Sequence, residues 1–199
     1  MAAPSPSSEH IPDSSVFRAA LRQEKLAGRL ALDATTHQAL SARIEAHLAA
    51  LLLPLPPQTL AFCAPFRGEF DARPLAALLL QRGWHAAMPI VGASDTPMSF
   101  RHWTPTAAMS TDRHGIPIPA AGKDCVPQLV LLPLVAFDAQ GFRLGYGGGY
   151  FDRTLAALVP RPYAIGVGFE LARVPDILPQ AHDMRLDAVV TEAGIVRHD

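Results

Sequence analysis

The chain has 199 residues and a formal net charge of −1, with 49% hydrophobic and 18% charged residues. This length and composition are typical of a globular protein with one full-sized hydrophobic core. The sequence has no Lys/Arg cluster and no excess of positive charge, so we expect neither nucleic acid nor a membrane surface among its partners.

Two segments bear on where the chain resides. Residues 1–13 lack a basic region followed by an apolar core, so we predict a disordered tail rather than a signal peptide. The longest uncharged run, residues 48–66, contains four prolines, which would break a membrane-spanning helix. Cys63 and Cys125 lack metal-site spacing and are predicted to be free thiols. We expect a cytoplasmic protein that acts on small molecules as a monomer.

The first half of the chain predicts a helical arm followed by strands and a further helix. Residues 13–15 offer N-caps for a helix that runs to roughly Leu32. Asp33 can start a second helix through Leu53, along which leucine and isoleucine form an apolar stripe. The pattern then predicts a buried strand at 60–63, a turn at Gly68, a helix at 74–80 and strands at 84–90 and 98–103.

The second half predicts a long loop and then alternating strands and helices. Residues 104–127 are rich in proline and poor in regular signals, so we expect a loop without regular structure. The later pattern predicts strands at 129–135, 163–169 and 188–191 and a helix around Thr154. We therefore predict a single three-layer α/β domain over residues 14–199. It has a mostly parallel central sheet flanked by helices and an N-terminal helical arm.

The most informative segment runs from Leu144 to Arg153 and reads LGYGGGYFDR. It connects the apolar strand at 129–135 to the following helix. Such a segment presents bare backbone N–H groups and the positive end of a helix dipole, which is what a phosphate needs. The spacing matches neither of the two common nucleotide-binding signatures. Ligands of parallel sheets sit beyond the carboxyl ends of the strands, where this segment is expected to lie.

A simple glycine-rich turn is the alternative interpretation of this segment, because glycine adopts positive φ at low cost. However, Arg143 and Arg153 bracket the glycines, and Asp152 stands at the expected helix start. A simple turn has no need of two guanidinium groups and a carboxylate. We therefore interpret the segment as an anion-binding site, with Asp152 able to hold a divalent cation.

Residues 130–138, VLLPLVAFD, and residues 141–153, GFRLGYGGGYFDR, resemble the signature of 5-formyltetrahydrofolate cyclo-ligases. These enzymes are also called 5,10-methenyltetrahydrofolate synthetases. The resemblance extends from about Arg18 to Thr191. It implies an enzyme that converts 5-formyltetrahydrofolate to 5,10-methenyltetrahydrofolate with ATP as co-substrate and Mg²⁺ as cofactor, releasing ADP and phosphate.

The resemblance also implies roles for individual residues. Arg143, facing the triphosphate, and Tyr150, with its aromatic face and hydroxyl, are the implied catalytic residues. The implied ATP-binding residues are Arg18, Arg22, Arg143, Leu144, Gly145, Tyr146, Gly147, Gly148, Gly149, Tyr150 and Phe151. The implied substrate-binding residues are Glu69, Tyr146, Gly147, Gly148, Gly149 and Tyr150.

Some of these positions match the family pattern and others depart from it. Arg18 and Arg22 share one face of the first helix and could clamp phosphates or form a solvated basic face. They resemble the family's K-x-x-L-R element, with Arg18 in place of Lys. Glu69 is either a surface carboxylate or the family's pterin ligand, which accepts two N–H bonds. Ile118 replaces a residue that is acidic in relatives, so no charged contact is expected there.

The candidate metal ligands are carboxylates on two separate segments. Asp152 could cap its helix or, as the resemblance implies, bind Mg²⁺. A hard cation needs a second carboxylate, and the element HDMRLD at residues 182–187 supplies two. Asp183 is the first candidate and Asp187 the second. Oxygen ligands together with ATP favour Mg²⁺ over a transition metal, even with His182 nearby.

Two other functions fit the same architecture. A sugar-phosphate isomerase would need one phosphate site and a general base, for which Glu69 is the candidate, but no ATP. A non-catalytic protein that binds a nucleotide or a folate would retain the same glycine segment and arginines.

Overall fold

The computed structural model describes residues 14–198. The predicted tail at residues 1–13 lies outside the described residues. Asp33 caps the second helix as predicted, and its Oδ1 accepts a hydrogen bond from the N–H of Thr36 at 2.8 Å. The helices are α1 Ser14–Leu30, α2 Ala34–Leu52, α3 Arg73–Leu80 and α4 Tyr150–Ala157, with a 3₁₀ turn at Glu170–Ala172.

A central sheet of eight strands has the order β12-β11-β10-β7-β1-β2-β3-β6. Its members are β1 Thr59–Ala61, β2 His85–Ile90, β3 Ser99–Trp103, β6 Asp124–Cys125, β7 Leu129–Pro133, β10 Tyr163–Val167, β11 Ala188–Thr191 and β12 Gly194–Arg197. The five strands at the centre run parallel, whereas β12 at one edge and β3 and β6 at the other are antiparallel to their neighbours. The predicted mostly parallel sheet is confirmed.

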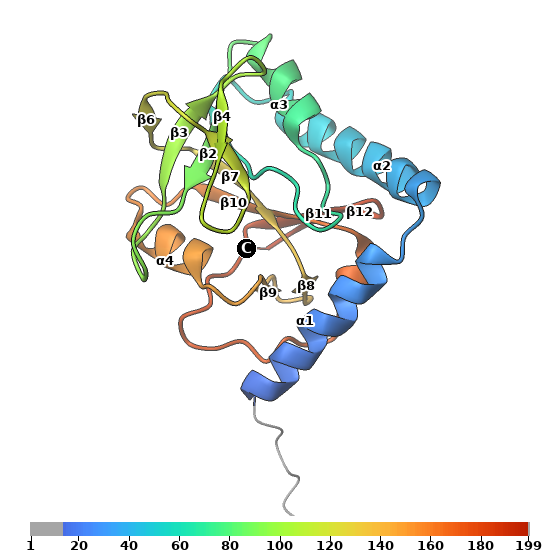
Figure 1. The fold of residues 1–199 in the computed structure, drawn as a ribbon. Coiled ribbons are helices and arrows are strands. Elements are labelled where there is room, and N and C mark those ends of the chain that lie inside the picture. The colour runs from blue at the N-terminus through green and yellow to red at the C-terminus, as the bar shows by residue number, and fades with distance from the viewer. Residues whose placement is uncertain (1–13, 199) are drawn as a thin grey trace, which may run out of the picture.

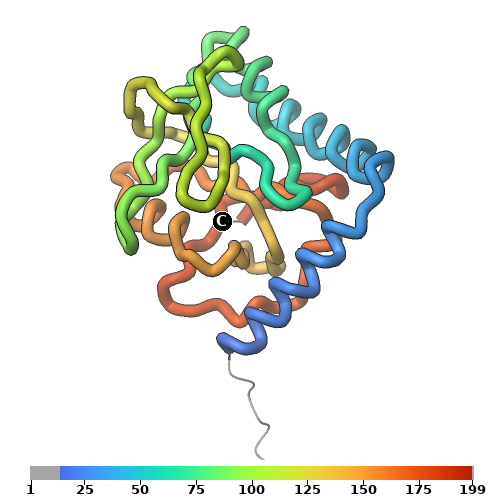
Figure 2. Tube along the Cα trace, in the orientation of Figure 1, coloured from blue at the N-terminus to red at the C-terminus, as the bar shows by residue number. Residues whose placement is uncertain are grey.

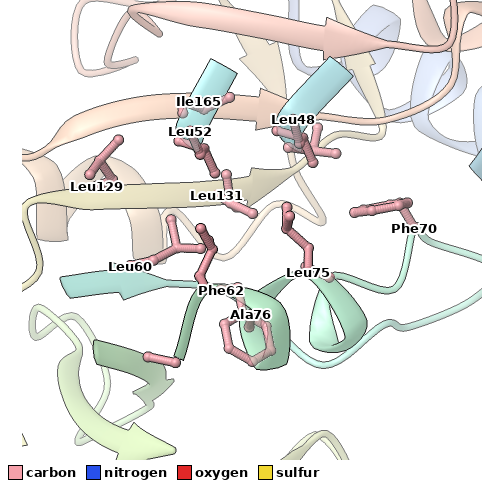
Figure 3. Packing of buried hydrophobic residues seen from close by; sticks show 14 of the residues in the cluster. Leu48, Leu52, Leu60, Phe62, Phe70, Leu75, Ala76, Leu129, Leu131 and Ile165 are labelled. Carbon is pink, nitrogen blue, oxygen red and sulfur yellow. The ribbon is translucent and has the colours of Figure 1, made fainter. Parts of the chain in front are cut away.

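Helices cover both faces of this sheet. Helices α2 and α3 pack on one face, and α4 packs on the other (Figure 1). On the first face, Leu48 and Leu52 of α2 meet Leu131 of β7 and Ile165 of β10 (Figure 3). Each of these four side chains is at most 4% exposed. The runs of apolar residues in the parallel strands are therefore explained by burial on two faces.

Helix α1 stands apart from this three-layer core as the predicted helical arm. It runs beside a small ribbon formed by β8 Ala136–Phe137 and β9 Arg143–Leu144 (Figure 1). Leu21 of α1 and Leu144 of β9 belong to one buried apolar cluster. Because β8 follows β7 directly, α1 is held against the carboxyl ends of the parallel strands.

The region from 104 to 127 differs from the predicted unstructured loop. It forms a hairpin of β4 Met109–Thr111 and β5 Pro117–Pro119, followed by the edge strand β6. Prolines are tolerated in β5 because this two-stranded ribbon has free edges that need no further backbone donors. In Figure 2 the hairpin reaches toward the segment that leads into α4. None of the described helices has the length and hydropathy needed to span a membrane.

Candidate active site

The glycine segment connects β9 to α4 at the carboxyl end of the sheet. Gly147 and Gly149 have φ of 97° and 63°, and Gly149 is the N-cap of α4. These left-handed conformations favour glycine because a Cβ would be strained there. Within the described residues, the amide N–H groups from Gly145 to Gly149 make no hydrogen bonds. The segment therefore carries unsatisfied donors at a helix start, as an anion site requires.

A cavity of about 740 Å³ opens beside this segment. One part of its wall consists of the glycine segment and the arginines of α1. Another part is apolar and includes Met88, Met98, Ile116 and Ile118. A cationic end joined to an apolar end suits a ligand pair in which one member is a polyanion and the other carries an aromatic ring.

Arg22 of α1 contacts the glycine segment directly. Its Nε donates to the carbonyl oxygen of Gly145 at 2.8 Å, and its guanidinium lies next to Gly147. Burial and the nearby charge of Arg18 lower the pKa of Arg22, while Asp183 opposes this shift. The guanidinium stays positive throughout the physiological range, so it can receive a phosphate.

Arg143 is buried with a side chain 4% exposed. Its Nη1 donates to the carbonyl oxygen of Met184 at 2.9 Å, and its Nη2 lies 3.1 Å from Oδ1 of Asp152. Burial lowers the pKa of Arg143, and the Asp152 carboxylate counteracts the shift. Arg143 thereby connects Asp152 at the start of α4 to the segment around Met184, which is far away in the sequence.

The proposed metal ligands differ in how their oxygens are used. Oδ1 of Asp152 accepts from Arg143 and from the N–H of Met184 at 2.9 Å, and Oδ2 makes no hydrogen bond to the described residues. Both oxygens of Asp183 are held by Arg18, with Nη2 to Oδ1 at 3.0 Å. Burial raises the pKa of Asp183, but the hydrogen bonds from Arg18 and Gln180 outweigh it, and the net pKa is lowered.

Of the two candidates in the 182–187 element, only Asp183 lines the cavity. Asp187 lies at the amino end of β11, where its carboxylate accepts from Arg161 at 2.8 Å and from the N–H of Ala164 at 2.6 Å. Residues 14–198 contain no group of three His, Cys, Asp or Glu side chains that could hold a metal ion. A protein-only cage is absent there, but Mg²⁺ commonly takes one or two carboxylates and completes its shell with phosphates and water. Asp152 fits that donor set.

Glu69 follows β1 and is buried at 7% exposure on the cavity wall. Its Oε1 accepts from the hydroxyl of Tyr146 at 2.8 Å, and its Oε2 accepts from the N–H of Phe66 at 3.0 Å. Burial raises the pKa of Glu69, opposed by Tyr146, Arg29 and the Phe66 N–H. Each oxygen keeps a second lone pair, so a ligand can still donate two bonds.

Arg29, which sequence reasoning missed, contacts two residues of the cavity wall, Tyr146 and Glu69. It is 6% exposed, and its Nη2 donates to the Tyr146 hydroxyl at 2.6 Å. It lies seven residues after Arg22, and two full turns of a helix place both residues on one face. The seven-residue spacing of Arg22 and Arg29 was therefore the sequence signal that could have identified Arg29.

Tyr150 begins α4 and is held by the tip of the β4–β5 hairpin. Its hydroxyl accepts from Nη2 of Arg113 at 2.7 Å and lies 3.2 Å from Nε2 of His114. The Arg153 guanidinium stacks over its ring, 5.3 Å from the centroid. Arg113 and His114 were also missed by sequence reasoning, because the hairpin that carries them was predicted as an irregular loop.

The structure brings most of the predicted residues to the cavity wall. Those that line it are Arg18, Arg22, Glu69, Arg143, Gly145, Tyr146, Gly147, Gly148, Gly149, Tyr150, Phe151, Asp152 and Asp183. Leu144 is the exception, since its side chain is 1% exposed and packs in the apolar cluster beneath α1. Only its backbone remains available for a ligand.

Fold and site together define an α/β protein in which a glycine-rich, arginine-lined anion site lies in the same cavity as the buried carboxylate of Glu69. The sequence model of the 5-formyltetrahydrofolate cyclo-ligase family matches residues 14–192. The chain belongs to this family.

Individual relatives support this membership. The 5-formyltetrahydrofolate cyclo-ligase of Escherichia coli strain K12 is 31% identical over 144 residues, which cover 69% of this chain and 79% of the relative. The solved 5,10-methenyltetrahydrofolate synthetase of Aquifex aeolicus has a TM-score of 0.79 at 26% identity, covering 91% of this chain and 92% of that one. The enzyme of the same name from Mycoplasma pneumoniae has a TM-score of 0.72 at 27% identity and covers 88% and 98%.

Proposed function

We propose that the protein catalyses the ATP-dependent cyclisation of 5-formyltetrahydrofolate to 5,10-methenyltetrahydrofolate, with release of ADP and phosphate. The observation that carries this proposal is the shared cavity. It joins the glycine segment and its arginines to the buried carboxylate of Glu69, so that a nucleotide and a pterin can meet in one chamber.

The chemistry explains why both substrates must bind together. A formamide oxygen is a poor nucleophile and a poor leaving group. Transfer of the γ-phosphoryl group of ATP to this oxygen yields an iminophosphate and ADP. N10 of the folate then attacks the activated carbon and releases its proton to solvent, and loss of phosphate leaves the methenyl cation in a five-membered ring. The protein's task in such a transfer is positioning and charge stabilisation.

Each proposed role rests on a position described above. Arg18, Arg22 and the amides of residues 145–149 bind the phosphates, and the backbone of Leu144 and the ring of Phe151 border them. Arg143 and Tyr150 act at the transferred group, because both border the cavity beside the start of α4. The substrate set is Glu69, Tyr146, Gly147, Gly148, Gly149 and Tyr150, with Glu69 accepting the N–H donors of the pterin.

We propose that Mg²⁺ accompanies ATP. Asp152 would be its first protein ligand, and Asp183 its second after Arg18 turns from this carboxylate to the phosphates. The ion would neutralise charge on the phosphate oxygens. We also propose that the protein acts as a monomer in the cytoplasm.

The test is direct. Purified protein is incubated with 5-formyltetrahydrofolate, Mg²⁺ and ATP, and the absorbance of 5,10-methenyltetrahydrofolate is followed. We expect product only when ATP is present, together with ADP in equal amount. Binding of both ligands without product would instead identify a binding protein. A protein that binds neither ligand would contradict the proposal.

A further inference from the structure

A buried hydrogen-bonded network centred on Arg29 connects four separate segments of the chain. From α1, its Nε donates to the carbonyl oxygen of Arg67 at 3.0 Å and its Nη1 to that of Leu134 at 2.8 Å. Its Nη2 donates to the Tyr146 hydroxyl at 2.6 Å and lies 3.8 Å from Oε1 of Glu69. One guanidinium thus contacts the turn after β1, the segment after β7 and the glycine segment.

The network has a fixed donor direction. Arginine has no acceptor, so the Tyr146 oxygen must accept from Arg29 and its hydroxyl proton must point elsewhere. Two acceptors lie within reach of that proton, Oε1 of Glu69 at 2.8 Å and the carbonyl oxygen of Phe66 at 3.5 Å, and the shorter bond to Glu69 receives it. The result is a one-way chain from Arg29 through Tyr146 to Glu69, which favours the ionised form of the carboxylate.

This arrangement matters because Glu69 is a poor site for a negative charge. Its side chain is 6% exposed, and burial raises its pKa. The titratable or charged groups that face it among the described residues are Arg29 on α1, Tyr146 on the glycine segment and the thiol of Cys63, two residues after β1. Arg29 alone brings a full positive charge.

We propose that Arg29 is a positioning residue for the reduced folate. It orients Glu69 and Tyr146 so that the carboxylate meets the pterin as an ionised acceptor of fixed geometry. This inference rests on the proposed function, because it assumes that Glu69 contacts the folate. The alternative is a purely structural clamp, in which Arg29 satisfies the carbonyls of Arg67 and Leu134 and has no further effect.

Binding measurements on matched variants separate these two roles. Arg29→Met removes the charge while keeping much of the volume, and Arg29→Lys restores the charge without the fork of donors. Lys25→Met is the control on the same helix, since Lys25 pairs with Glu24 of that helix, at 3.4 Å. For each variant, the Kd of 5-formyltetrahydrofolate and the Kd of ATP are measured separately across pH, alongside the melting temperature.

We expect Arg29→Met to raise the folate Kd about tenfold or more, in line with the loss of a charge-assisted hydrogen bond. The ATP Kd should change little, Arg29→Lys should recover part of the folate affinity, and Lys25→Met should match the wild type. Loss of the cation raises the pKa of Glu69 further. On acidification, Arg29→Met should therefore lose folate affinity at a higher pH than the wild type.

Other outcomes overturn the inference. Equal changes in both Kd values, or a lower melting temperature with an unchanged folate Kd and pH profile, would establish the structural clamp. If the wild-type protein binds the folate but forms no product, the proposed cyclisation is refuted. The folate Kd values of the Arg29 variants still decide whether Arg29 positions Glu69. If the wild-type protein binds no folate, both the proposed cyclisation and the positioning role of Arg29 are refuted.

Discussion

Gly149 is the last residue before α4. It has a φ of 63°, a conformation that other residues rarely adopt. A Cβ there would also lie 2.7 Å from Nη1 of Arg153. We expect Gly149→Ala to lower the free energy of unfolding by about 1–2 kcal/mol. Gly145→Ala is the matched control, because a Cβ at Gly145 meets nothing within 4 Å, and it should stay within about 0.5 kcal/mol of the wild type. Urea unfolding of both variants checks this, and equal losses would contradict it.

Arg143 combines a role in turnover with a role in stability. Its guanidinium lies at the cavity wall and in a nearly buried pair with Asp152. Arg143→Met should lower turnover about a hundredfold. It should also cost up to about 3 kcal/mol, because it leaves Asp152 unpaired.

The double variant Arg143→Met with Asp152→Asn separates the two roles. Removing both charges should return much of the stability and none of the turnover. Assays of product formation and urea unfolding of the same preparations give both numbers. A single variant with near-normal turnover, or a double variant as unstable as the single one, would refute this assignment.

Sequence could identify single site residues where the chemistry is local or where the chain matches the family pattern. Arg143 was predicted from the glycine segment beside it and Arg22 and Glu69 from the resemblance, and all three line the cavity. The pairing of Arg18 with Asp183 joins residues 165 positions apart, and no local pattern encodes such a contact. Only the structure therefore showed that Asp183, the second candidate metal ligand, is already bound to an arginine.

Among the elements, the β4–β5 hairpin is the largest departure from the sequence pattern. Its prolines lowered the expectation of strands, because the pattern cannot show that a two-stranded ribbon leaves its outer edges unpaired. The hairpin matters for the site because its tip carries Arg113 and His114 to the hydroxyl of Tyr150.

Removing the polar tip of this hairpin should weaken nucleotide binding without harming the fold. We expect the double variant Arg113→Ala with His114→Ala to raise the KM for ATP about two- to tenfold, the range for lost hydrogen bonds of this kind. Both residues are exposed, so the melting temperature should be nearly unchanged. Arg82→Ala, at an exposed arginine remote from the cavity wall, is the control. A KM equal to that of the control would assign the tip no part in ATP binding.

At the scale of the whole molecule, α1 is tied to the C-terminal region through Arg18 and Asp183. Burial raises the pKa of Asp183, but its hydrogen bonds prevail and leave the pKa below the usual value. A depressed folded-state pKa contributes stability above the unfolded-state value of about 3.9. That contribution is lost as pH falls through the folded-state pKa.

Unfolding experiments from pH 6 to about pH 3 test this connection. The difference in unfolding free energy between the wild type and Asp183→Asn should shrink as the pH falls. Asp71→Asn is the comparison, because the Asp71–Arg73 pair lies at the surface and should contribute little. A difference that stays constant with pH would mean that the carboxylate charge of Asp183 does not stabilise the fold.

Ligand binding should stabilise the whole molecule, and the part of this stabilisation that depends on Mg²⁺ tests the proposed metal site. At about 100 times its Kd, a ligand that binds only the folded state adds about 2.7 kcal/mol. For a chain of this length, that raises the melting temperature by about 5–10 °C. We expect this rise with ATP and Mg²⁺ and a smaller one with ATP and EDTA. Asp152→Asn should abolish the difference between the two conditions, because its carboxylate is the proposed first ligand, while Arg22→Met should reduce the rise in both. An Asp152→Asn protein that retains the full magnesium-dependent increment would exclude Asp152 as a ligand and leave the ion to the phosphates and Asp183.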